Sequence, residues 1–130
     1  MTMRLSTLLA GSLITALSAH AADGAMPAPP RSACRATLSA GDARSLAAAT
    51  PNARAFEQNL HASISTAVAR ASASSVSVRV TAQMPERGTQ EVGLYSVNLH
   101  SGHVVDDDQE PAEDHETAVV RERLMAKHCH

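Results

Sequence analysis

The sequence predicts an α+β domain in which helices pack on one face of a three-stranded antiparallel meander, with a terminal helix and one disulfide. Three observations predict this class: apolar residues at helical spacing up to Ser72, strict alternation from Ser75 onward, and cysteines near both ends of the expected mature chain. The chain has 130 residues, with 11 basic and 13 acidic side chains. That length suits one domain, and the charge balance argues against nucleic-acid binding, which usually requires a basic patch.

The first residues have the pattern of a secretory signal peptide. Arg4 precedes a mostly apolar run, and Ala19 and Ala21 occupy the −3 and −1 positions of a cleavage site. The run is too short and too interrupted for a membrane-spanning helix, which needs about 20 apolar residues. We therefore expect a periplasmic or secreted protein that has no membrane association after cleavage. The expected segments are a signal peptide, a flexible Pro/Ala-rich leader and a single domain, at residues 1–21, 22–33 and 34–130.

Two cysteines, Cys34 and Cys129, remain after the expected cleavage. In an oxidising compartment such a pair is most simply a disulfide, which would stabilise the fold by about 4–5 kcal/mol because it closes a long loop. The crosslink matters because Phe56 and Tyr95 are the only aromatic residues. The alternative is that Cys129 is a thiolate metal ligand within His128-Cys129-His130.

Helical patterns lie on both sides of the expected strands. Asp42 is placed to cap a short helix through Ala49, and Thr50-Pro51 has the capping residue and first-turn proline of a second helix. We expect this second helix to run to about Ser72. A terminal helix is expected after Pro111, with acids in its first turn and bases in its last. The apolar stripe of the second helix comprises Phe56, Leu60, Ile64, Ala67, Val68 and Ala71.

The strands follow a period of two. The run from Ser75 places Val76, Val78, Val80 and Ala82 on one face. In the next strand the alternation slips, and a bulge near Gly93 would reconcile its two halves.

A two-residue turn at Ser101-Gly102 would start the third strand. It would pair His100 with His103, Leu99 with Val104 and Val97 with Asp106. The apolar face of the hairpin would then carry Tyr95, Val97, Leu99 and Val104.

The hairpin sequence "YSVNLHSGHVV" resembles the strand-turn-strand signature of PepSY-type domains, small secreted modules with the pattern Tyr-x-Val-Asp-x-x-Thr-Gly-x-Val. The matching or nearly matching positions within residues 95–104 are Tyr95, Val97, Ser101, Gly102 and Val104. Asn98 stands where the family usually has Asp. The resemblance implies a periplasmic inhibitory or regulatory binding module without a catalytic centre. Small secreted immunity proteins share the same general profile.

The acidic run that follows the hairpin is the best candidate for a partner surface. The common interpretation of such a run is a solvated loop that leads into a helix, and the functional alternative is a negative surface that docks on a basic cleft. We predict that the partner is another protein with such a cleft. The candidate partner-binding residues are Asn98, His100, His103, Asp106, Asp107, Asp108 and Glu110.

The competing class is a periplasmic metal-binding protein. His100 and His103, as cross-strand neighbours, could share zinc or copper, but two ligands do not make a site. Catalysis has little support, because the sequence has no Gly-x-Ser-x-Gly, no His-Glu-x-x-His and no phosphate-binding glycine loop. A catalytic group assembled from scattered His, Ser and Asp residues is the remaining alternative. We predict a protein that is not an enzyme and has no cofactor.

Overall fold

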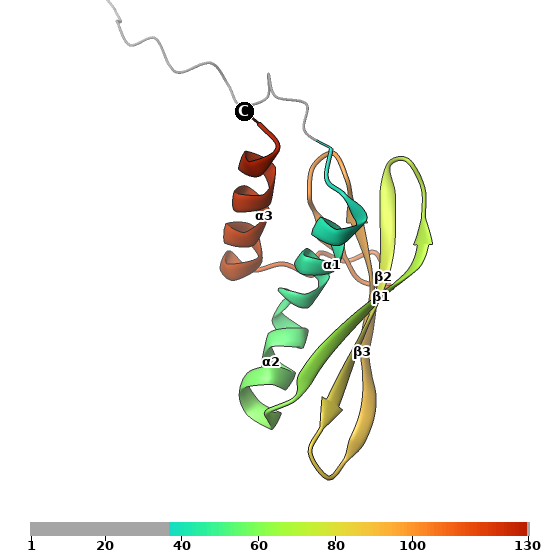
Figure 1. Ribbon diagram of the computed structural model, residues 1–130, viewed down its shortest axis with the longest axis vertical. Helices are drawn as coiled ribbons and strands as arrows, with labels where there is room; N and C mark the ends of the chain where they lie inside the picture. Colours follow the sequence, from blue (N-terminus) through green and yellow to red (C-terminus); the bar gives the residue numbers. More distant parts are fainter. Residues whose placement is uncertain (1–36, 130) are drawn as a thin grey trace, which may run out of the picture. The chain divides into compact units, whose positions relative to one another are not determined.

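Figure 1 shows the computed structural model, which describes residues 37–129. The fold is α+β, as predicted, but its antiparallel sheet has four strands in the order β1-β2-β3-β4, and the prediction of three was wrong. The elements follow one another as α1 (Ala40–Ala48), α2 (Pro51–Leu60), β1 (Ser63–Ala71), β2 (Ser75–Met84), β3 (Gly88–Asn98), β4 (Val104–Val105) and α3 (His115–Lys127).

The additional strand comes from the second predicted helix, which was extended too far. Helix α2 begins at Pro51 as expected but ends at Leu60, and His61 takes a left-handed conformation with φ 52°. Residues 63–71 then form β1 and pair with β2. The β-branched residues in this segment favour strand, and the apolar positions fit both a helical and an alternating period. Pairing with the valine-rich β2, which sequence spacing cannot reveal, decides between them.

The core is built from the alternating valines of β2. Val76, Val78 and Val80 are at most 2% exposed, and the predicted face of this strand is confirmed. Their neighbours on β3 are Tyr95 and Val97, which are also buried. The core is completed from α1, from the residues before it and from the hairpin, chiefly by Leu38, Ala43, Leu46, Ala47, Leu99 and Val104. The predicted apolar face of the hairpin is therefore correct.

The predicted bulge in β3 is also confirmed. Val80 pairs with Gly93 while Thr81 pairs with Glu91, so Val92 is the extra residue. Gly93 has a second role, because a Cβ at this position would lie 3.0 Å from the Tyr95 hydroxyl oxygen. The tyrosine ring therefore lies against the glycine, an arrangement that a larger residue would disturb.

The helices are not all packed on one face of the sheet, which corrects the predicted layering. Helices α1 and α2 contact β1, β2 and β3, whereas α3 packs chiefly on α1 (Figure 1). The reason is the composition of α3, in which Thr117 is the one fully buried residue of the helix. Without a broad apolar stripe, α3 has little surface to bury against a sheet. Its partly buried Val120, Leu124 and Met125 pack against the core. Ion pairs from Arg121 to Glu113 and from Lys127 to Asp42 also hold the helix.

Candidate functional site

The predicted site begins at the turn between β3 and β4, where Asn98 has a structural role. Its Oδ1 accepts hydrogen bonds from the backbone N–H groups of His100 at 2.8 Å and Ser101 at 2.9 Å. The Gly102 N–H donates to the Asn98 carbonyl at 2.7 Å, with Gly102 at φ 77°. An asparagine that accepts from the residues after it forms an Asx turn. The Asn98 side chain therefore stabilises the turn, whereas we predicted that it would lie free on the polar face of the hairpin.

The register of the hairpin differs from the prediction. Val97 pairs with Val104 and Ser96 with Val105, so Leu99 and His100 belong to the turn and not to a strand. The predicted cross-strand pair of His100 and His103 is therefore wrong. The Leu99 N–H donates to the Ser74 carbonyl at 2.9 Å, so contact with the turn between β1 and β2 lengthens the hairpin turn beyond two residues.

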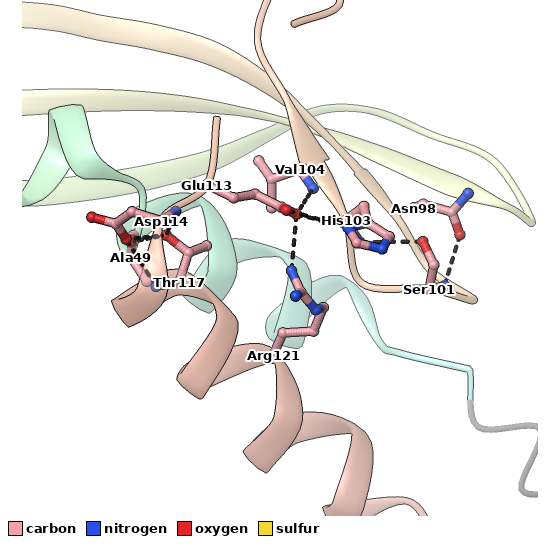
Figure 2. Close-up of polar contacts among 9 residues, drawn as sticks. All are labelled: Ala49, Asn98, Ser101, His103, Val104, Glu113, Asp114, Thr117 and Arg121. Carbon is pink, nitrogen blue, oxygen red and sulfur yellow. Dashed lines mark hydrogen bonds and ion pairs between the residues drawn. The ribbon is translucent and has the colours of Figure 1, made fainter. Parts of the chain in front are cut away.

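His103 is instead joined to Glu113, which holds the hairpin against the start of α3 (Figure 2). Glu113 accepts from the Val104 N–H at 2.7 Å and from Arg121 at 3.0 Å, and it lies 3.1 Å from the His103 Nδ1. Burial alone would raise the pKa of Glu113. The Val104 N–H, His103 and Arg121 outweigh that effect, so the pKa lies below its ordinary value. Glu113 is therefore a charged anchor with 17% of its side chain exposed.

Gly102 allows Arg121 to reach this anchor. A Cβ on Gly102 would lie 2.7 Å from the Arg121 Cγ and 3.4 Å from the Leu38 Cδ1. The arginine chain thus passes directly over the hairpin turn. The positive φ and this close approach both require glycine at the position that the sequence assigns to the turn.

The acidic loop of residues 106–110 contains both structural and exposed acids. The Asp106 Oδ1 accepts from the backbone N–H groups of Asp108 at 2.9 Å and Glu110 at 3.0 Å, so Asp106 closes the loop on itself. Asp107, Asp108 and Glu110 are exposed. Within the described part of the chain, none of these three side chains forms an ion pair that would neutralise it. The loop therefore presents a group of negative charges to solvent.

Two adjacent depressions lie beside this loop, on the face of the sheet that points away from α1 and α2. The larger has a volume of about 370 Å³, and the smaller has a volume of about 100 Å³. Both are open to solvent, and Ser96 lines both. Four predicted partner-binding residues also line them, namely Asn98 and His103 in the larger and Asp106 and Asp107 in the smaller. The predicted residues thus do gather on one surface, although Asn98 and Asp106 also maintain its shape.

Asp42 is a second largely buried carboxylate besides Glu113, and the sequence predicted only that it caps a helix. Ser39 is the N-cap of α1, and Asp42 is the third helical residue of a capping box whose Oδ2 accepts from the Ser39 N–H at 2.9 Å. Asp42 also binds the far end of α3, at 2.9 Å from the Lys127 Nζ and 2.7 Å from the His128 Nε2. Burial opposes its ionisation, but these partners hold the pKa of Asp42 well below its usual range. The spacing Ser39-x-x-Asp42 signals the cap, but no local pattern reveals the contact with α3.

The cysteine prediction lies partly outside the described residues. Cys129 is the single cysteine of residues 37–129, so no disulfide joins two described residues. Cys34, His130 and the predicted signal peptide and leader all fall outside that range. The crosslink between Cys34 and Cys129 therefore stays a prediction. The His128 Nε2 lies 2.7 Å from the Asp42 Oδ2. The suggested grouping of His128, Cys129 and His130 around a metal stays a prediction, because His130 lies outside the described residues.

Two features are absent from residues 37–129. No group of three or more His, Cys, Asp or Glu side chains is arranged to hold a metal ion. No helix in this range is long and apolar enough to cross a membrane. Comparison with known proteins adds no family assignment, because no family model, curated protein or solved structure matches the chain.

Proposed function

We propose that this chain is a secreted, periplasmic protein-binding module that inhibits or regulates its partner. The partner-binding surface is formed by the two depressions beside Ser96 together with the exposed acids of residues 107–110. We name this the loop surface. An open, shallow surface suits contact with another protein better than capture of a small molecule, which usually requires a deep and largely apolar pocket.

One observation carries the proposal: residues selected from sequence as partner-binding line adjacent depressions on a single face. The charges next to those depressions define the partner. Asp107, Asp108 and Glu110 are exposed and close in sequence, so they would attract and orient a basic surface. We therefore propose a partner with a basic cleft, and a role for this chain in covering that cleft.

Export and the inhibitory role rest on the sequence. The pattern of residues 1–21 supports secretion, and an oxidising compartment would favour the expected bond between Cys34 and Cys129. The resemblance of residues 95–104 to PepSY-type domains supports inhibition or regulation as the outcome of binding. These are proposals about location and consequence, and they can be tested separately from the loop surface.

The test compares two triple variants of the full chain. Asp107→Asn, Asp108→Asn and Glu110→Gln removes the charges of the loop surface, whereas Glu57→Gln, Glu116→Gln and Glu122→Gln removes the same number of exposed acids from the helices. A photo-crosslinking residue at position 109 would identify a partner in the periplasmic fraction. Affinity for that purified partner is then measured by calorimetry at low and moderate salt.

The loop variant should bind about ten-fold more weakly and lose much of its salt dependence, while the helix variant should bind like the native chain. Equal weakening by both variants would indicate a general charge effect and would contradict a local surface. Unchanged binding of the loop variant would eliminate the loop surface.

A further inference from the structure

The two edges of the sheet are protected to very different extents. At one edge β4 has two residues, and Val105 forms a bridge to Pro111, so the loop covers this edge and proline limits further pairing. At the other edge β1 has nine residues and pairs with β2 on one side. Among residues 37–129, no strand pairs with the other side of β1. A long edge strand with unpaired backbone groups is a template for another strand.

The side chains along β1 do little to block such pairing. Arg70 is its only charged residue and lies at the register shift that follows Val68, while the rest of the strand is small or β-branched. Val68 is 41% exposed, and Leu60, at the end of α2 just before the strand, is 39% exposed. A segment that paired with β1 would cover Val68 as well as the unpaired backbone groups.

The charges beside this edge are positive. The Arg44 Nε of α1 donates to the Thr66 Oγ1 of β1 at 3.0 Å, so an exposed guanidinium lies on the helix-facing side of the strand. Arg70 pairs with Ser77, whose side chain is on the opposite face, so a second exposed guanidinium lies there. β1 itself contains no acidic residue. The edge therefore attracts an extended segment that has acidic side chains on both of its faces.

A second copy of this chain fits the edge poorly. If two copies form one continuous antiparallel sheet, their paired β1 residues must point to the same face, so the two-fold axis passes through a residue. The pairing that places Val68 opposite Ile64 of the other copy has its axis at Thr66. Because Arg44 is bonded to Thr66, that arrangement places two guanidinium groups together near the symmetry axis. Like charges at such a position oppose association. An acidic segment from a different protein has no such penalty.

We infer that the open edge of β1 binds an extended acidic segment of another protein by strand addition. The added strand forms backbone hydrogen bonds with β1, places an apolar side chain beside Val68, and directs carboxylates toward Arg44 and Arg70. The unpaired edge of β1 is the opposite edge of the sheet from β4 and carries the opposite charge to the acidic loop, although Arg70 pairs with Ser77, which lines the smaller depression of the loop surface. The two proposals use different probes and different residues for their readouts, so either can fail while the other holds.

The experiment uses the full chain and two labelled peptides. The acidic probe is a short peptide of valine and threonine with two glutamates three positions apart, which matches the spacing of Thr66 and Arg70 along the ladder and places them on opposite faces. The matched probe has lysines in their place. Binding is followed by fluorescence anisotropy, and hydrogen exchange locates the peptide. We expect the acidic probe to bind at least about ten-fold more tightly than the lysine probe and to slow exchange of the amides of residues 63–71.

Three variants test the residues involved. Arg44→Glu with Arg70→Glu should reverse the preference between the two probes. Arg87→Glu with Arg123→Glu, at exposed positions in the turn between β2 and β3 and on α3, should leave the preference unchanged. Val68→Lys places a charge on the edge and should weaken both probes by about ten-fold. Circular dichroism establishes that each variant is folded.

Several outcomes would overturn the inference. Equal binding of the two probes would exclude charge recognition, and exchange protection outside β1 would place the peptide elsewhere. Failure of the acidic probe to bind the folded chain would exclude strand addition by such a segment. A dimer in sedimentation experiments that Val68→Lys abolishes would replace the acidic partner with a second copy.

Discussion

The acids around α3 and the acids of the 106–110 loop are used in different ways. Asp42 and Glu113 are largely buried, with 5% and 17% of their side chains exposed, and each accepts at least three hydrogen bonds. Asp107, Asp108 and Glu110 are exposed. Asp42 and Glu113 therefore serve the fold, whereas the exposed acids of the loop are available to a partner. Burial and hydrogen-bond partners, and not charge density along the chain, separate the two classes.

The largest loss of stability should come from Asp42→Ala, which removes the carboxylate that joins the start of α1 to the end of α3. The Ser39 N–H, Lys127 and His128 would lose an acceptor that is almost fully buried, and we expect the free energy of unfolding to fall by about 3 kcal/mol. Urea unfolding followed by circular dichroism measures this loss. Asp42→Asn, which keeps an acceptor oxygen, should lose less. A change below about 0.5 kcal/mol in both variants would contradict a structural role.

The next effect should come from Glu113→Ala, which leaves the Val104 N–H and Arg121 without their shared acceptor. We expect a loss of about 2 kcal/mol, because the carboxylate binds charged partners and a backbone donor. The measurement is again urea unfolding. If hydrogen exchange at Val104 and along α3 remained as slow as in the native chain, Glu113 would not be the anchor between the hairpin and the helix.

Lowering the pH should reproduce part of these losses of folding stability. Asp42 and Glu113 have pKa values below those of the unfolded chain, so the folded state binds fewer protons near the ordinary values of 3.8 and 4.5. Their contribution to stability is complete above those values and is lost as the pH falls toward the lowered folded pKa values. Unfolding curves between about pH 6 and pH 2 should show this decline, with a shallower slope in Glu113→Gln. Equal slopes would show that Glu113 contributes nothing to the acid response.

A smaller effect should come from Asp106→Ala, which belongs to the loop but acts within the backbone. Its Oδ1 accepts from the N–H groups of Asp108 and Glu110, and loss of such a cap costs about 1 kcal/mol. Asp106→Asn retains the acceptor and should be close to native. This pair of variants sharpens the comparison by separating the one structural acid of the loop from its exposed neighbours.

The smallest effect should come from Asp107→Asn with Asp108→Asn. Both side chains are exposed, so the free energy of unfolding should change by less than about 0.5 kcal/mol. The same measurement serves as the folding control for binding experiments on the loop surface. A loss as large as that of Glu113→Ala would break the comparison, because it would place the exposed acids among the structural ones.

The sequence by itself determined the features that depend on neighbouring residues. Alternating valines established β2, the slipped alternation located the bulge beside Gly93, and Thr50-Pro51 marked the start of α2. The apolar face of the hairpin was also correct. In each case local sterics, side-chain period or turn chemistry is sufficient, because no distant contact alters the preference.

The tertiary structure decided whatever depended on a remote partner. Residues 63–71 became a strand because β2 was available to pair with them, and contact of Leu99 with Ser74 changed the register of the predicted hairpin. The same holds for acids: Asp42 and Glu113 differ from Asp107 only in what α3 and the hairpin bring near them. Long-range pairing and burial determine these roles, and both depend on how distant segments meet, which residue spacing does not encode.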